Sequence, residues 1–247
     1  MPRVRADLLL LERGLAESRE SARRLIMAGK VRVGTTVLVK PATMIDPAAP
    51  VEVIAPPRYV SRGGLKLEAA LDTFHIDVAG LRCLDIGAST GGFTDCLLQR
   101  EAASVCAVDV GRAQLHARLR ADPRVHLREH VNARDLPELP PVDFFVADVS
   151  FISLKKVLPS VQSHTHPGTI GAVLLKPQFE AGPADVPRGG VIRDDTVRER
   201  VLRDFLDWLG SREWTVLGSM TCPIHGGDGN IEYFVHVATP SPGAPAC

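Results

Sequence analysis

Short apolar runs alternate with helical patterns from about residue 80 to the end of the chain. The predicted strands cover residues 81–86, 104–110, 142–147 and 170–176, and the predicted helices between them cover residues 92–100, 111–121 and 195–209. Residues 214–220 and 231–237 are predicted to form two last strands, an antiparallel pair at one side of the sheet. Buried strands separated by helices are typical of a Rossmann-like, doubly wound α/β domain with a mainly parallel sheet.

The N-terminal segment has a different pattern, which predicts a small α+β domain. Residues 5–14 form an amphipathic helix that ends at a glycine, and Ser18 is placed to cap a second helix. Residues 31–39 alternate as a small hairpin does. We therefore divide the chain into a domain at 1–54, a proline-containing linker at 55–61 and a larger domain at 62–247.

Composition excludes several classes of protein. The 247 residues are 45% hydrophobic and 23% charged, as expected for a globular chain rather than a disordered one. No apolar stretch approaches the length of a membrane span, and no signal-peptide core precedes the first helix, so we expect a cytoplasmic protein. The five cysteines form no CxxC pair, which favours buried free thiols over disulfides and leads us to expect no metal site.

The formal net charge of zero conceals two halves of opposite sign. Residues 1–66 contain 12 Lys and Arg against 6 Asp and Glu, whereas residues 67–247 contain 17 against 23. A basic module joined to an acidic one suggests an arm that binds a polyanion. Exposed basic helix faces are common, so charge alone leaves a plain solvated surface as an alternative.

A glycine-rich segment follows the first predicted strand of the larger domain. Its spacing, D-x-G-x-x-x-G-G from Asp85 to Gly92, departs from the G-x-G-x-x-G fingerprint of dinucleotide sites. Asp109 closes the second strand, where a carboxylate can hold ribose hydroxyls. Both NAD and S-adenosylmethionine sites use such a residue, but Asp85 at the start of the loop favours S-adenosylmethionine. A loop that merely turns tightly is the structural alternative.

Three more charged residues are predicted near the same edge of the sheet. Asp148 follows the predicted strand at 142–147, Lys176 ends the predicted strand at 170–176, and Glu232 begins the last predicted strand at 231–237. Lys66 lies on the helix that leads into the sheet. Ligand sites in open α/β sheets lie at the carboxyl ends of the strands. A lysine at a strand end is more often simply solvated, so one such residue is weak evidence for a site. The prediction depends on the four residues together.

These motifs resemble those of known families. Residues 3–53 resemble the S4 RNA-binding domain, although Gly34-Thr35 stands where that family often has Asn-Gly. Lys66, Asp148, Lys176 and Glu232 match the K-D-K-E tetrad of FtsJ-like ribose 2′-O-methyltransferases. The whole chain, about residues 3–238, resembles the TlyA family through the motifs SRGGLKL, DIGASTGGF, ADVSFISL, LLKPQFEAG, GGVIRD and GNIEY. One departure is Tyr59-Val60, where the family often has Trp-Val.

The resemblance implies methyl transfer from S-adenosylmethionine to a cytidine 2′-hydroxyl of ribosomal RNA. It implies that Lys176 is the general base, with a pKa lowered by Lys66 and partial burial, and that Asp148 and Glu232 hold the lysines and the hydroxyl. The implied cofactor-binding residues are Asp85, Gly87, Ser89, Thr90, Gly91, Gly92, Phe93, Asp109, Asn132, Asp135 and Asp148. The implied RNA-binding residues are Arg5, Arg19, Arg23, Lys40 and Arg62. The chain ends 15 residues after Glu232, and shorter family members are associated with 23S rRNA, so we expect the 50S subunit to be the favoured substrate.

Three alternatives remain at the level of sequence. A non-catalytic ribosome-assembly factor would keep the fold but not need all four tetrad residues. A membrane-active haemolysin, as the family's inherited name suggests, would need an amphipathic or spanning segment, which the sequence does not offer. A nicotinamide oxidoreductase is disfavoured by the glycine spacing and by the S4-like arm.

Overall fold

The computed structural model describes residues 2–54, 57–139 and 142–240. The chain divides into two compact units, Met1–Arg58 and Tyr59–Cys247. Residues 55 and 56 of the predicted linker lie outside the described residues, and residues 59–61 belong to the second unit. Each unit is described by itself below.

The first unit is the small α+β domain that the sequence predicts. Helices α1 (Ala6–Glu12) and α2 (Arg19–Met27) pack beside a three-stranded antiparallel sheet in which β2 (Val31–Val33) lies between β3 (Thr36–Leu38) and β5 (Val51–Val53). A short pair, β1 (Val4–Arg5) and β4 (Met44–Ile45), completes it. The Ser18 hydroxyl accepts a hydrogen bond from the Ser21 amide at 3.1 Å, which confirms the predicted cap of α2. Leu9, Leu10, Ile26 and Val31 lie in its core.

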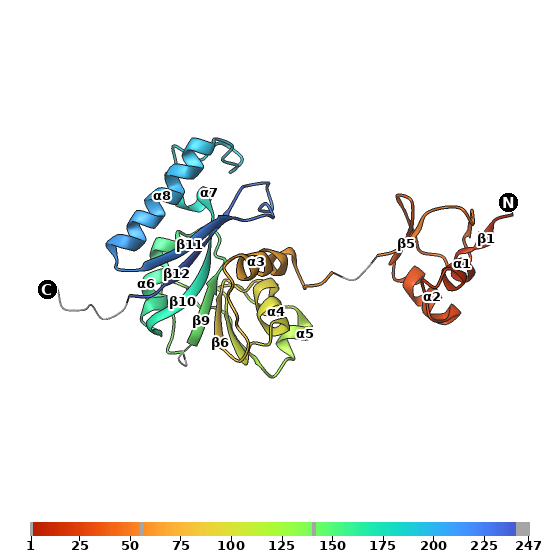
Figure 1. Ribbon diagram of the computed structural model, residues 1–247, viewed down its shortest axis with the longest axis horizontal. Helices are drawn as coiled ribbons and strands as arrows, with labels where there is room; N and C mark the ends of the chain where they lie inside the picture. Colours follow the sequence, from red (N-terminus) through yellow and green to blue (C-terminus); the bar gives the residue numbers. More distant parts are fainter. Residues whose placement is uncertain (1, 55–56, 140–141, 241–247) are drawn as a thin grey trace. The chain divides into compact units, whose positions relative to one another are not determined.

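The second unit is built on a seven-stranded sheet (Figure 1). The strands are β6 (Arg82–Ile86), β7 (Ser104–Val108), β8 (Val125–Arg128), β9 (Val142–Ala147), β10 (Thr165–Leu175), β11 (Thr215–Thr221) and β12 (Tyr233–Ala238), in the spatial order β11-β12-β10-β9-β6-β7-β8. Strands β10, β9, β6, β7 and β8 run parallel, while β12 is antiparallel to both β10 and β11. This arrangement confirms the doubly wound, mainly parallel sheet with an antiparallel pair at one side.

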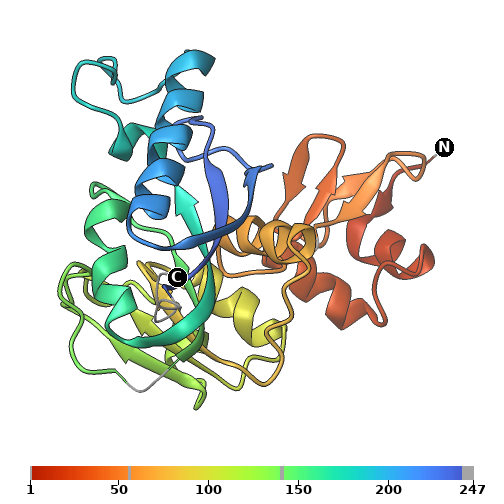
Figure 2. The same ribbon diagram turned by 60° about the vertical axis from the view of Figure 1, so that its left-hand side comes forward.

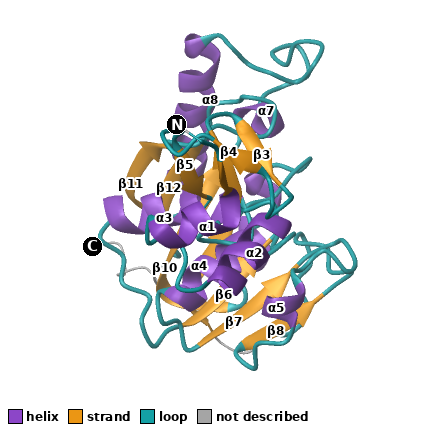
Figure 3. Ribbon diagram, turned by 90° about the vertical axis from the view of Figure 1, so that its right-hand side faces the viewer, coloured by secondary structure: helices purple, strands orange, loops and turns teal. Residues whose placement is uncertain are grey.

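Helices cover both faces of that sheet (Figures 1 and 3). They are α3 (Arg62–Thr73), α4 (Gly92–Gln99), α5 (Ala117–Arg120), α6 (Leu158–Gln162), α7 (Pro177–Glu180), α8 (Asp195–Ser211) and the 3-10 turn η1 (Leu154–Lys156). Alternation along β9 shows how the sequence builds two cores. Phe144 and Val146 pack with residues of α3 and α4, whereas Phe145 and Ala147 pack with residues of α6 and α8.

Two of the differences from the prediction have a clear physical cause. The helix expected at 111–121 is reduced to α5, because side-chain acceptors hold the preceding loop: Asp109 accepts from the Gly111 amide and Glu129 accepts from the Ala113 amide. The sequence pattern also missed β8, an edge strand whose four residues alternate between half-buried and exposed. Short edge strands carry little apolar signal, so periodicity does not distinguish them from loops.

The described cysteines Cys83, Cys96, Cys106 and Cys222 are buried free thiols, as predicted, and Cys247 lies outside the described residues. Among the described residues, no cluster of three or more His, Cys, Asp or Glu side chains is arranged to hold a metal. No helix in this part of the chain is long and apolar enough to cross a membrane.

Candidate active site

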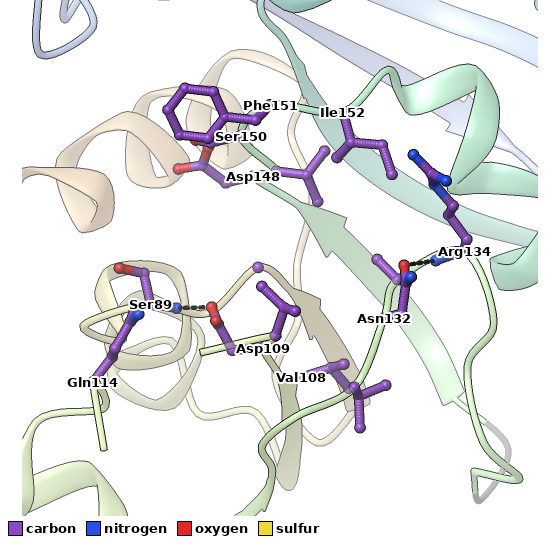
Figure 4. Close-up of a pocket in the computed structure, with 15 residues that line it drawn as sticks. Ser89, Val108, Asp109, Gln114, Asn132, Arg134, Asp148, Ser150, Phe151 and Ile152 are labelled. Atoms are coloured by element: carbon purple, nitrogen blue, oxygen red, sulfur yellow. Dashed lines mark hydrogen bonds between the residues drawn. The ribbon is translucent and has the colours of Figure 1, made fainter. Parts of the chain in front are cut away.

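The loops that follow β6, β7, β8 and β9 surround a cavity of about 520 Å³ (Figure 4). Strand β6 lies between β7 and β9, so the chain leaves β6 toward one side of the sheet and later returns to the other. Such a topological switch point is where open α/β sheets bind ligands. The volume falls within the range of ~300–1,000 Å³ that is usual for small-molecule and cofactor sites.

Glycines let the loop after β6 lie directly against the end of β9. Gly87 has φ +83°, and a Cβ there would overlap the carbonyl oxygen of Asp148. Gly91 has φ +97° and caps the N-terminus of α4. An L-residue with a side chain is strained at both positions. The loop is therefore a backbone cradle that opens a polar surface to a ligand.

Asp109 is fixed at one side of the cavity by two backbone amides. Its Oδ2 accepts from the Ser89 amide at 2.7 Å and its Oδ1 from the Gly111 amide at 2.6 Å. Figure 4 shows Asp109 and Val108 on the side of the cavity opposite Asp148 and Phe151. A carboxylate has about four lone-pair sites, so the remaining ones can accept from the hydroxyls of a ribose. Apolar contact for a flat base is available from Val108, Val110, Val131, Val149 and Ile152.

The predicted cofactor-binding residues are distributed over two adjoining cavities. The larger one is lined by Gly87, Ser89, Asp109, Asn132 and Asp148. The second, of about 230 Å³, shares Gly87, Ser89 and Asp148 with it and adds Thr90, Gly92, Phe93, Arg62 and Lys66. Gly91 lines neither cavity. Asp135 is exposed and also outside both, so we do not assign it to the cofactor.

Asp85 lies beneath the cradle rather than in either cavity. It is fully buried, and its Oδ2 accepts from the Thr94 hydroxyl at 2.6 Å, while its Oδ1 is buried without a hydrogen-bond partner among the described residues. Burial raises the pKa of Asp85 to about 7, and the negative charges of Asp148 and Asp109 add to the rise, against the lowering effect of the Thr94 hydrogen bond. Asp85 is thus an acid that titrates near neutrality.

The four tetrad residues form two ion pairs. Lys66 Nζ lies 2.5 Å from Glu232 Oε2, and both side chains are nearly inaccessible to solvent. Lys176 Nζ lies 2.5 Å from Asp148 Oδ1 and also donates to the Ser150 hydroxyl at 3.0 Å. The prediction placed the cation of Lys66 beside Lys176. In the structure each amine has its own carboxylate, so Glu232 compensates the charge of Lys66.

Beside Lys176 lies an aromatic pair that the sequence reasoning missed. Phe151 is 90% exposed with φ +62°, and its ring centroid lies 5.0 Å from that of Phe179. Lys176 Nζ lies 5.8 Å from the Phe179 centroid. An exposed aromatic ring held in a strained backbone conformation is unusual away from functional sites. The signal in the sequence was the Ser-Phe pair that follows Asp148 and Val149.

Lys66 owes its position to close packing between α3 and α4. A Cβ on Gly92 would overlap the hydroxyl of Ser61 and the amide of Gly64, and a Cβ on Gly64 would overlap the ring of Tyr59. Tyr59 is buried, and its hydroxyl donates to Glu68 at 3.1 Å. The aromatic residue that the sequence analysis put in the linker therefore packs against the helix that carries Lys66.

The predicted RNA-binding residues of the first unit fall into two groups. Arg5 and Arg19 share the buried carboxylate of Asp7, at 2.9 and 3.1 Å, and their hydrogen bonds lower the pKa of Asp7 to about 2. Arg23 and Lys40 are exposed and form no ion pair within the described residues. Arg62, the first residue of α3 in the second unit, is exposed at the second cavity.

Comparison with known proteins identifies the family of the chain. The FtsJ-like methyltransferase family matches residues 59–239, and the S4 domain matches residues 4–51. The chain is 46% identical to the 16S/23S rRNA (cytidine-2′-O)-methyltransferase TlyA of Mycobacterium tuberculosis, over 96% of this chain and 90% of that protein. The chain belongs to the TlyA family of FtsJ-like methyltransferases.

Other members bear two kinds of name. Hemolysin A of Brachyspira hyodysenteriae is 42% identical, with 94% of this chain and 99% of that protein covered. The 23S rRNA (cytidine-2′-O)-methyltransferase TlyA of Campylobacter jejuni is 36% identical, with 72% and 70% covered. A solved structure of a hemolysin-named protein from Streptococcus thermophilus is 40% identical, with a TM-score of 0.72 and coverage of 100% of this chain and 93% of that one.

The family matches agree with the two units of this TlyA-family chain. The FtsJ-like match begins at residue 59, where the second unit begins, and the S4 match lies wholly within the first unit. The whole FtsJ-like match, including Tyr59, therefore lies within the second unit.

Proposed function

We propose that this protein transfers a methyl group from S-adenosylmethionine to the 2′-hydroxyl of a cytidine in ribosomal RNA. The proposal rests on two ion pairs beside the glycine cradle. Lys66 pairs with Glu232, and Lys176 pairs with Asp148. Asp148 belongs to both cavities, and Lys66 lines the second, so the tetrad lies where a cofactor and a nucleotide would meet.

The residues of the larger cavity fit S-adenosylmethionine. The backbone cradle at Gly87, the fixed carboxylate of Asp109 and the apolar side chains around Val131 would hold the polar tail, the ribose and the adenine in turn. When bound there, the cofactor supplies an electrophilic methyl group. The chain itself must bind and orient the ribose, exclude water and manage the proton of the 2′-hydroxyl.

Lys176 is the proposed general base. A ribose hydroxyl is a poor nucleophile at neutral pH, so its proton must be removed as the methyl group is transferred in line. Asp148 and Ser150 hold Lys176 Nζ from two directions, which fixes the atom that would accept that proton once the amine has given up its own proton to solvent. Glu232 holds Lys66 in the same way, and Lys66 would orient the hydroxyl.

The S4 unit supports an RNA substrate. Its net positive charge suits a polyanion, and phosphate contacts would position the RNA without specifying its sequence. We propose the 50S subunit as the favoured substrate, because both rRNA methyltransferases named above are 23S enzymes by name, and one is also a 16S enzyme. A folded RNA whose target nucleotide enters the site would satisfy this arrangement.

The test is methyl transfer from labelled S-adenosylmethionine to unmethylated 50S and 30S subunits. Lys176→Ala should lower the rate at least ~10²-fold, the scale of general base catalysis, while cofactor binding measured by calorimetry is retained. Lys156→Ala, an exposed lysine of η1, is the matched control and should leave the rate unchanged. Label that persists in Lys176→Ala would contradict the base assignment. Label in 30S alone would contradict the substrate preference, and no label with the wild-type protein would favour an assembly factor.

A further inference from the structure

Two sequence motifs of the catalytic unit, GGVIRD at residues 189–194 and GNIEY at residues 229–233, meet through one buried side chain. Asn230 is 2% exposed. Its Oδ1 accepts from the Ile192 amide at 3.0 Å, and its Nδ2 donates to the Gly190 carbonyl at 2.9 Å. Apart from Glu232, neither motif has a role in the site described above. Asn230 therefore clamps the loop between α7 and α8.

The same residue connects this loop to the tetrad. The Asn230 carbonyl accepts from the Gly226 amide at 2.9 Å, and two residues later Glu232 pairs with Lys66. Figures 2 and 3 show the loop of residues 182–194 projecting from the catalytic unit next to α8. Gly189 and Gly190 have φ +101° and +75°, so the turn depends on glycine and on the Asn230 clamp. A projecting loop is thus held beside the segment that leads through Glu232 into β12.

The loop contains two arginines and two aspartates, but only the aspartates are engaged in side-chain interactions within the described residues. Each acidic side chain is already engaged: Asp185 pairs with Arg200 at 2.6 Å, Asp194 accepts from the Thr196 amide at 2.8 Å, and Asp195 pairs with Arg198. Arg188 and Arg193 are exposed, and neither forms an ion pair within the described residues. Both line a cavity of about 420 Å³ on this loop, together with Asp185 and Asp194.

We propose that Arg188 and Arg193 bind backbone phosphates of the RNA beside the target nucleotide, with Asn230 as the positioning residue. The inference rests on the proposed function and deepens it, because it gives the catalytic unit an RNA contact of its own. Exposed guanidinium groups match phosphate geometry in a bidentate way. The clamp gives them a fixed distance from Glu232 through a short stretch of chain, so phosphate binding here would set the register of the ribose at Lys176.

The experiment measures the binding of 50S RNA by the full chain as a function of salt. Arg188→Gln/Arg193→Gln should weaken binding ~10-fold and reduce the slope of log K against log salt by about 1.4, the loss of two phosphate contacts on single-stranded RNA. Arg212→Gln at the opposite end of α8 is the matched control and should leave the slope unchanged. The affinity for S-adenosylmethionine should be the same in the wild type, in the double arginine variant and in the Arg212→Gln control.

Asn230→Ala tests the clamp, because it removes no charge. It should reduce the salt slope in the same direction as the double arginine variant, which a purely structural defect with intact phosphate contacts would not do. An unchanged slope in the double variant, with wild-type methylation intact, would overturn the inference and leave the proposed function standing. A reduced slope in a protein whose wild-type form methylates no RNA would support the phosphate contact and reject the proposed function.

Discussion

At the scale of one residue, Asp85 lies buried beneath the glycine cradle, and this burial changes its acidity. The carboxyl group is buried with one oxygen unpartnered, and its neighbours Asp148 and Asp109 are also acidic. In the folded protein its pKa is about 7, against an ordinary value of 3.8. Between pH 3.8 and about 7, Asp85 is therefore protonated in the folded protein but ionised in the unfolded chain.

This proton makes the stability of the catalytic unit depend on pH. Because the folded-state pKa is raised, stability is highest below pH 4 as far as this group is concerned, falls as the pH rises from 4 to 7, and is constant above that. The difference between a pKa of 3.8 in the unfolded chain and about 7 in the folded protein corresponds to about 4 kcal/mol of unfolding free energy. Asp85→Asn keeps an acceptor for Thr94 and should flatten this part of the profile, so the variant should exceed the wild type in stability at pH 8. Urea unfolding at pH 4.5, 6 and 8 measures it, and parallel profiles would contradict the assignment.

Sequence reasoning found the tetrad but not the way in which its members pair. Lys66, Asp148, Lys176 and Glu232 follow from family motifs and from their places at strand ends. Which amine pairs with which carboxylate depends on how far each side chain reaches across the edge of the sheet. The spacing of the residues along the chain gives no information on this. Ser150 was missed for the same reason, since it contributes through a contact with a residue 26 positions away.

At the scale of elements, helices α3 and α4 pack closely because the glycines at their contact have no side chains. Gly92→Ala would normally favour a helix, but here the added Cβ meets Ser61 and Gly64. We expect the variant to lose about 1–3 kcal/mol of stability through overpacking and, by displacing α3, to reduce both kcat and cofactor affinity. Gly210→Ala in α8 is the matched control, because its Cβ meets no atom within 4 Å, and it should be neutral or stabilising. Thermal unfolding and steady-state kinetics decide between them, and equal behaviour of the two variants would contradict the packing argument.

Hydrophobic periodicity predicts some elements of this fold and misses others. Central strands such as β9 are buried on both faces and appear as continuous apolar runs, so their positions follow from the sequence. The region after β7 was predicted as one long helix, but the side chains of Asp109 and Glu129 bind its backbone amides and leave only α5. Local side-chain competition of this kind has no periodic signal.

At the scale of the whole molecule, positive and negative charge are divided between the two units. Residues 1–58 contain 10 Lys and Arg against 6 Asp and Glu, whereas residues 59–247 contain 19 against 23. An acidic catalytic unit repels RNA in general, so the arm must supply most of the attraction. Arg23 and Lys40 are exposed there and have no ion pair within the described residues, unlike Arg5 and Arg19, which share Asp7.

This division predicts a separation of kinetic effects. Arg23→Gln/Lys40→Gln should raise KM for the 50S subunit about tenfold and reduce the salt slope of binding by about 1.4, while kcat at saturating RNA stays unchanged. The reason is that these side chains bind substrate and transition state equally. Arg212→Gln again serves as the surface control. If kcat fell with KM unchanged, the arm would be acting on the chemical step, and the separation of affinity from catalysis would have to be abandoned.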